Sequence, residues 1–158
     1  MKKKINFAIS FLILLYSCQN SSKTETVAYT KQDLKKIGWI EGNWKGMDGN
    51  SPFYEIYKFV NDSTIESISY KWDGKDSSQS SKSFLEWKES KYYLGDMMNW
   101  KVSQISDSSI NMIPNFKAQN DIMWKFINQN SWDAILNSKE GNKIYHMERI
   151  NHFAKKEN

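Results

Sequence analysis

The chain of 158 residues has few of the residues that most often carry chemistry. It contains one cysteine, Cys18, and two histidines, His146 and His152. A single cysteine excludes an intramolecular disulfide, and the two histidines do not form a metal-ligand spacing with each other or with the cysteine. Gly-x-Ser-x-Gly, His-Glu-x-x-His and glycine-rich phosphate loops are also missing. We therefore expect no metal site and no cofactor.

The sequence also lacks a hydrophobic run of the roughly 20 residues that a membrane-spanning helix needs. The apolar run near the start, from Ile5 to Leu15, is shorter and follows three lysines at positions 2–4. It ends at Leu15-Tyr16-Ser17-Cys18. A basic start, a short apolar run and small residues at its end are typical of an export signal.

Because the only cysteine stands where the cleavage site is expected, this segment resembles a bacterial lipoprotein signal with its lipobox. The resemblance implies cleavage before Cys18, lipidation of Cys18, and a place in the bacterial envelope, on the periplasmic face or at the outer membrane. An uncleaved anchor and a plain secretory peptide are the alternatives. We expect a signal at 1–17, a lipidated tether at 18–29, a domain at 30–153 and a polar tail at 154–158.

A strong excess of positive charge is missing once the signal is set aside. Residues 1–17 hold three lysines and no acidic residue, which leaves 19 basic and 18 acidic residues in the rest of the chain. The lysines are scattered among acidic residues and serines. Such a distribution argues against nucleic-acid binding.

The pattern from residue 30 onward predicts one short helix and then only strands. Thr30 and Asp33 begin a helix over 31–37, Leu34 and Ile37 share one face, and Gly38 ends it. Alternating or aromatic-rich stretches then recur every 8 to 12 positions. The expected strands are 42–47, 53–60, 64–72, 83–88, 91–96, 99–105, 109–113, 121–128, 132–137 and 143–150. A longer serine-rich loop is expected over 73–82, as a solvated hairpin tip or as a mobile flap.

No long helical pattern interrupts these strands, so an antiparallel meander is favoured over a parallel α/β sheet. Closure of the meander removes its exposed edges. The sequence therefore predicts an all-β fold, a closed antiparallel barrel of about 8–10 strands with a short N-terminal helix.

The Gly42-Asn43-Trp44 run resembles the glycine-x-tryptophan signature of calycins, the group of barrels that includes lipocalins and fatty-acid-binding proteins. In lipocalins an arginine of the last strand packs across that tryptophan, and the only arginine here, Arg149, lies in the last predicted strand. The resemblance implies that Trp44 and Arg149 are in contact beneath the helix. A guanidinium stacks on an indole better than an ammonium group does.

The span from Leu34 to Ile150 also resembles a lipocalin-like family of bacterial lipoproteins of unknown function. Members of that family usually carry a His-Asp-Phe-Pro run in the region that here reads 112–117. Pro114 is present but the histidine run is not. A site built on that histidine is therefore not implied for this chain.

Twenty of the 23 aromatic residues follow the signal, and several alternate with polar residues. Alternation places such residues on one face of a strand. They either fill the barrel interior or line an apolar pocket with polar tips. The pocket interpretation predicts ligand-binding residues Tyr57, Tyr70, Trp72, Trp124 and Phe126, with an entrance near 73–82.

Two minor alternatives remain open in the sequence. Glu55 and Glu66 lie in neighbouring predicted strands and could form a carboxylate pair of the kind found in glycosidases. His146 lies on the last strand, where the nitrobindins, a related barrel group, carry a haem-binding histidine. Our main expectation is a lipid-anchored barrel that binds a small apolar molecule; the alternatives are a filled structural or interaction barrel and a carboxylate-dependent enzyme.

Overall fold

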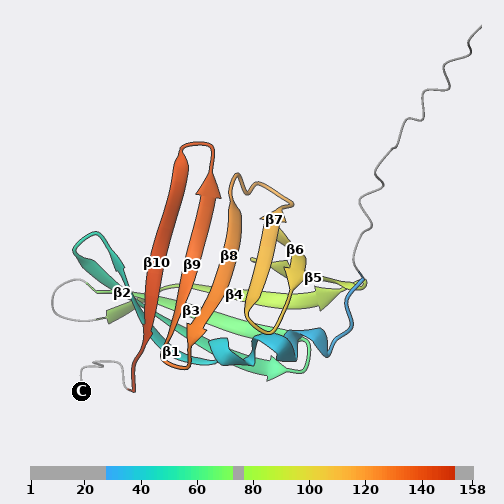
Figure 1. Ribbon diagram of the computed structural model, residues 1–158, viewed down its shortest axis with the longest axis horizontal. Helices are drawn as coiled ribbons and strands as arrows, with labels where there is room; N and C mark the ends of the chain where they lie inside the picture. The colour runs from blue at the N-terminus through green and yellow to red at the C-terminus, as the bar shows by residue number, and fades with distance from the viewer. Residues whose placement is uncertain (1–27, 73–76, 152–158) are drawn as a thin grey trace, which may run out of the picture.

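A computed structural model describes residues 28–72 and 77–151 of the chain. The expected signal with Cys18, most of the tether, the polar tail and residues 73–76 lie outside these ranges. Within them, ten antiparallel strands form a closed barrel in which each strand pairs with the next one along the chain and β1 pairs with β10. The predicted fold class is confirmed (Figure 1).

The barrel is preceded by one short 3₁₀ helix, η1 (Asp33–Ile40). The strands follow with short connections and correspond closely to the ten expected ones. Their bounds are β1 (Gly42–Asp48), β2 (Ser51–Asn61), β3 (Thr64–Trp72), β4 (Ser77–Lys88), β5 (Lys91–Leu94), β6 (Trp100–Ile105), β7 (Ser109–Pro114), β8 (Asp121–Asn128), β9 (Ser131–Ser138) and β10 (Gly141–Arg149).

The prediction of a serine-rich loop over 73–82 is wrong for residues 77–82, which belong to a strand. Strand β4 begins at Ser77, and Ser77 to Lys82 pair with β3, from Trp72↔Ser77 to Ile68↔Lys82. Serine has a low strand propensity, which hid this half of the strand. Backbone hydrogen bonds to β3 hold this half in the sheet, although its serine side chains do not predict a strand.

Helix η1 also differs from its prediction, because it continues past Gly38 to Ile40 and is kinked at Ile37. The helix is 3₁₀, and in a 3₁₀ helix side chains three positions apart lie above one another. Leu34, Ile37 and Ile40 follow this spacing, and all three are completely buried. Burial of this three-residue stripe extends the helix across Gly38.

Helix η1 covers one end of the barrel, and the chain enters at this end (Figure 1). Lys35 reaches Asp62 in the β2–β3 turn at 3.4 Å, and the Tyr29 N–H donates to the Ser90 carbonyl at 2.8 Å. Tyr29, expected in the tether, is buried against Tyr92. The folded domain therefore begins before Thr30. No helix within the described ranges has the length and hydrophobicity that a membrane crossing requires.

The predicted contact between Trp44 and Arg149 is present. The two residues are cross-strand partners in β1 and β10, and the guanidinium carbon lies 4.2 Å from the centre of the indole ring. The guanidinium also donates to three backbone carbonyls, those of Gln129 (2.8 Å), Glu41 (2.9 Å) and Trp39 (3.1 Å). Arg149 thus joins the last strand to the first strand, to the end of η1 and to the β8–β9 turn.

Gly42 is required by this arrangement. Its φ of 137° lies in a region that residues with a side chain rarely adopt. A Cβ at this position would lie 2.3 Å from Nη1 of Arg149. Any other residue would displace the guanidinium that closes the barrel.

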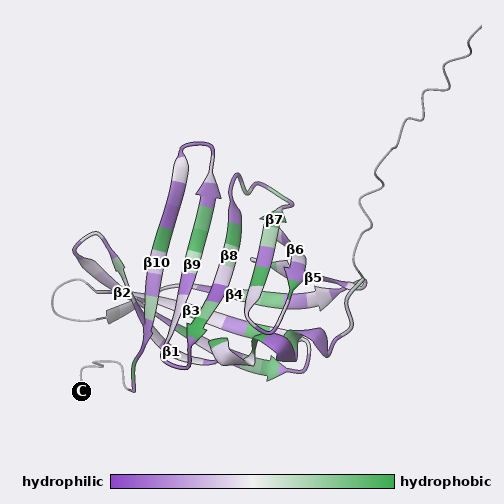
Figure 2. Ribbon diagram, in the orientation of Figure 1, coloured by the Kyte–Doolittle hydropathy of each residue, from purple (hydrophilic) through white to green (hydrophobic). Residues whose placement is uncertain are grey.

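The helix end of the barrel is filled by aromatic rings. Trp132 is completely buried and packs against the rings of Trp39, Trp44, Tyr57 and Trp124, with centroids 5.8–6.2 Å apart. Such edge and tilted contacts are the favoured geometries for aromatic pairs. Figure 2 shows hydrophobic and hydrophilic residues alternating along the strands, as expected when one face is turned inward.

We expect Trp44→Ala to lower the free energy of unfolding by about 3–5 kcal/mol, because it empties a filled core. Arg149→Lys should cost less, about 0.5–2 kcal/mol, because a lysine keeps the charge but loses the stacked plane and most of the carbonyl contacts. The double variant should lose less than the sum. Urea unfolding measures all three, with Glu148→Gln on the exposed outer face of the same strand pair as control. Strictly additive losses would contradict the coupling.

Candidate functional site

The half of the barrel away from η1 contains a cavity of about 780 Å³. Its lining residues come from strands all around the barrel. Tyr57 and Trp124, which border the filled aromatic cluster, form its floor, and the exposed residues Asp48, Ser51 and Lys71 lie at its rim. The cavity therefore opens at the end where β1 turns into β2 and β3 leads to β4.

One wall of the cavity is apolar. It is formed by inward-facing residues of β2, β5, β6, β8, β9 and β10. The apolar and aromatic residues are Phe53, Leu94, Trp100, Ile122, Trp124, Ala134, Leu136, Tyr145 and Met147. Trp100 is held in place by a hydrogen bond from its Nε1 to the Asn120 carbonyl at 2.8 Å.

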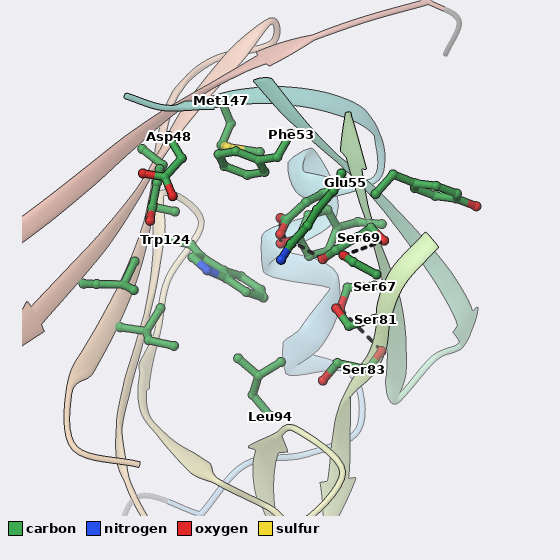
Figure 3. Close-up of a pocket in the computed structure, with 18 of the residues that line it drawn as sticks. Asp48, Phe53, Glu55, Ser67, Ser69, Ser81, Ser83, Leu94, Trp124 and Met147 are labelled. Atoms are coloured by element: carbon green, nitrogen blue, oxygen red, sulfur yellow. Dashed lines mark hydrogen bonds between the residues drawn. The ribbon is translucent and has the colours of Figure 1, made fainter. Parts of the chain in front are cut away.

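The facing wall is polar and is built from serines of β3 and β4. Ser67 and Ser69 alternate on β3, and Ser81 and Ser83 are their cross-strand partners on β4. Figure 3 shows these four side chains facing Trp124 across the cavity. The Ser67 hydroxyl donates to the Ser83 carbonyl at 3.4 Å and the Ser69 hydroxyl donates to Glu55, so both hydroxyl oxygens can still accept a hydrogen bond from a molecule inside. The cavity is therefore amphipathic.

Glu55 is the acidic residue of the cavity wall. It projects from β2 beside Ser69, its cross-strand partner, whose hydroxyl donates to Oε1 at 3.2 Å. The Tyr57 hydroxyl donates to Oε2 in a short hydrogen bond. Desolvation raises the pKa of the Glu55 carboxyl, although the hydrogen bonds from Tyr57 and Ser69 act in the opposite direction. Burial, and after it the neighbouring Glu55 carboxylate, raises the pKa of Tyr57 well above its usual value.

The seam between β1 and β10 is closed by side chains at the mouth of the cavity. Backbone pairing of these strands is limited to Trp44↔Arg149 and Lys45↔Glu148, near η1. Closer to the mouth, Lys143 Nζ lies 2.8 Å from Asp48 Oδ1, and the rings of Phe53 and Tyr145 meet edge to face at 5.3 Å. An ion pair and an aromatic contact replace backbone hydrogen bonds where the two strands separate.

Three of the five residues predicted to bind a ligand border the cavity: Tyr57, Tyr70 and Trp124. Tyr70 follows Ser69 at a register shift and pairs across the strands with Tyr54. The Trp72 side chain lies outside the described part of the structure. The prediction is wrong for Phe126, which does not line the cavity. Its ring packs against that of Trp39 of η1 in the filled end of the barrel, with ring centroids 5.6 Å apart.

The predicted carboxylate pair of Glu55 and Glu66 is not formed. Glu55 faces the cavity, whereas Glu66 stands between Ile65 and Ser67 on the outer face of β3 and forms an ion pair with Lys82. Side chains alternate between the two faces of a sheet, and the register of β2 with β3 places Glu55 on the inner face and Glu66 on the outer face. The barrel wall therefore separates the two carboxylates. The glycosidase-like interpretation of this pair is therefore wrong.

The haem interpretation of His146 is also unsupported by its position. His146 is exposed, and its Nδ1 lies 2.7 Å from Asp133 Oδ1 on the outer face of β9. Its neighbours in sequence, Tyr145 and Met147, are the residues that line the cavity. Among the described residues, no three His, Cys, Asp or Glu side chains are grouped as metal ligands.

Sequence reasoning treated Glu55 only as half of a pair and missed the serine wall. A signal was available for both. Glu55 and Tyr57 alternate on a strand whose inward face is aromatic, and Ser67 and Ser69 alternate in register with it. The sequence does not reveal the pairing of the first half of β4 with β3, because the serines of that half give no strand signal.

Comparisons of the chain with family models, with curated proteins and with solved structures gave no match in any of the three.

We expect Glu55→Gln to stabilise the protein at neutral pH. The folded-state pKa of Glu55 is raised above its ordinary value of about 4.5, so the folded protein holds this proton more tightly than the unfolded chain does. The stability that this proton contributes is fully present below pH 4.5 and is lost as the pH rises through the raised pKa of Glu55. Each unit by which the pKa is raised corresponds to about 1.4 kcal/mol. Glutamine keeps the acceptor for Tyr57 and carries no charge.

Thermal unfolding of both proteins between pH 4 and pH 8 measures this effect, and the melting temperatures should diverge as the pH rises. Glu66→Gln is the matched control, because Glu66 lies on the outer face, away from the cavity, and is paired with Lys82. Parallel curves for wild type and Glu55→Gln would show that burial does not disfavour the carboxylate.

Proposed function

We propose that the barrel binds one small, largely apolar molecule with a polar group, held in the cavity between the aromatic wall and the serine wall. The observation that carries this proposal is the amphipathic lining of the cavity. A pocket with mostly apolar walls and a few polar groups on one side is the usual design of a small-molecule site.

The size of the cavity supports a single ligand. Its volume of about 780 Å³ lies within the range of roughly 300–1,000 Å³ typical of sites for drug-sized molecules. The aromatic cluster around Trp132 closes the cavity from below, so a bound molecule would enter from the end opposite η1. Removal of apolar surface from water would supply most of the affinity, at about 25 cal/mol per Å².

A filled structural barrel is the alternative that the sequence left open, and each interpretation fits one half of the molecule. The half next to η1 is packed with the rings of Trp39, Trp44, Trp124 and Trp132. The other half is hollow. A protein that needed only a stable scaffold would gain by filling the second half as well, since packing of apolar side chains contributes stability. This argument favours the ligand-binding function.

Lipid anchoring of the chain through Cys18 to a membrane of the bacterial envelope is part of the same proposal. Its support is the signal-like sequence of residues 1–18 together with the point where the chain enters the barrel. Tyr29 packs beside Tyr92 at the η1 end. A tether that leaves this end would keep the mouth of the cavity on the side away from the anchor. Kinship with calycins is proposed on the arrangement of Gly42, Trp44 and Arg149.

A fluorescent apolar probe should bind the chain carrying Cys18→Ala with a micromolar Kd and quench tryptophan emission. Ala134→Phe should weaken that binding at least tenfold, because Ala134 lines the cavity between Trp124 and Tyr145 and a ring there would occupy the space. Ile144→Phe, on the exposed outer face of β10, is the matched control. Probe binding unaffected by Ala134→Phe would contradict binding in this cavity.

Trp124→Ala is a less specific test of ligand binding than Ala134→Phe. Trp124 lines the cavity, but it is buried and packs against Tyr57 and Trp132 at 5.4 and 5.8 Å. Its removal should therefore weaken ligand binding and also destabilise the barrel by about 3 kcal/mol or more.

Cys18→Ala should abolish membrane attachment in cells that process bacterial lipoproteins. Two or more acyl chains anchor a protein stably, each buried methylene contributing about 0.8 kcal/mol, whereas the remaining chain has no other predicted attachment. Metabolic labelling with a radioactive fatty acid and membrane sedimentation measure the effect, with Ser17→Ala as the control. A correctly cleaved Cys18→Ala product that still sediments with membranes would contradict the proposal.

A further inference from the structure

We propose that Glu55 selects the ligand of this cavity, and that the preferred class is an amphiphile with a protonated amine rather than a fatty acid. This inference rests on the proposed function and specifies its ligand. It depends on where the charge and the hydrogen-bond acceptors of the cavity lie.

The first step concerns the hydrogen-bonding capacity of Glu55. An ionised carboxylate accepts about four hydrogen bonds. Two acceptor positions are occupied, one by the Tyr57 hydroxyl on Oε2 and one by the Ser69 hydroxyl on Oε1. Because Glu55 lines the cavity, the remaining positions are available to a donor on a molecule inside it. A protonated amine has three donors and no acceptor.

The second step concerns charge. Within the described part of the chain, no cationic side chain is within ion-pair distance of Glu55. Lys143 is paired with Asp48 at the mouth, and Lys71 lies exposed at the rim. A cation placed inside the cavity would therefore give Glu55 the partner that the protein does not provide. A carboxylate in the same place would face Glu55 with like charge.

The third step concerns the body of the ligand. Glu55 lies on β2 next to Ser69, Trp124 lies across the cavity from the serines, and Leu94 lies at the lower end of the view, as Figure 3 shows. A molecule with its amine at Glu55 would extend its apolar part along the wall formed by Leu94, Ile122 and Leu136. The serines on the near wall would accept or donate to polar atoms close to the amine. This arrangement fits a single-headed amphiphile.

Three ligands that share one alkyl chain separate the possibilities: decylamine, decanol and decanoate. Each is titrated below its micelle concentration into the Cys18→Ala full-length chain at pH 7, by calorimetry. Charge-assisted hydrogen bonds contribute more than neutral ones, so decylamine should bind roughly 10- to 100-fold more tightly than decanoate and at least several-fold more tightly than decanol.

Glu55→Gln should remove the preference for the amine, bringing decylamine to the affinity of decanol, and should improve the binding of decanoate. Glu66→Gln, on the outer face, should leave all three affinities unchanged. Near-ultraviolet circular dichroism of each variant checks that the aromatic cluster is intact. Since the glutamine oxygen can accept from the Tyr57 hydroxyl and its amide group can donate to the Ser69 hydroxyl oxygen, Glu55→Gln is expected to fold.

The outcomes separate this inference from the function on which it rests. If none of the three ligands binds a folded chain, the proposed binding function fails. If they bind but decanoate equals or exceeds decylamine, the selection by Glu55 is overturned. If Glu55→Gln leaves the amine preference intact, Glu55 is not its source.

Discussion

The structure depends on the network that Arg149 forms at the η1 end of the barrel. One guanidinium stacks on Trp44 at 4.2 Å and donates to the carbonyls of Trp39, Glu41 and Gln129. Those contacts lie in β1, at the end of η1 and in the β8–β9 turn. Because backbone pairing of β1 with β10 covers only two residue pairs, this network supplies much of the closure. The network requires glycine at position 42, since a Cβ there would occupy the place of Nη1 of Arg149.

Closure at one end permits the barrel to be hollow at the other. The rings packed around Trp132 form a core that does not require the mouth to be filled. The mouth can then carry groups that weaken a fold, such as a desolvated carboxylate at Glu55 and strand positions occupied by serine. Groups that are unfavourable for stability and face a cavity are typical of binding sites. The division between a packed end and a polar hollow end thus matches the proposed function.

The sequence predicted those features that depend on local pattern or on a single distinctive pair. Strand positions followed from alternation, and the Trp44–Arg149 contact was expected from the resemblance of Gly42, Trp44 and the single arginine to the calycin pattern. The length of η1 was missed because its stripe of Leu34, Ile37 and Ile40 has 3₁₀ rather than α-helical spacing. The first half of β4 was missed because serines give no strand signal, and the polar wall was missed with it. The inward or outward direction of Glu55 and Glu66 required the register of β2 and β3, which sequence spacing alone did not determine.

The polar wall also explains why an interior of this size is compatible with a stable barrel. A cavity lined only by apolar side chains would favour collapse, because each removed contact costs dispersion energy. Here Gly46 lets the Phe53 ring and Met147 approach the β1 backbone, which fills the apolar side next to the seam. On the other side the hydroxyls of Ser67, Ser69 and Ser81 give water hydrogen-bonding partners. A ligand that replaces water on the apolar wall and brings a donor to Glu55 therefore gains apolar burial without leaving that carboxylate unpaired. A protonated amine with an alkyl chain meets both conditions, whereas an ionised fatty acid has no donor for Glu55.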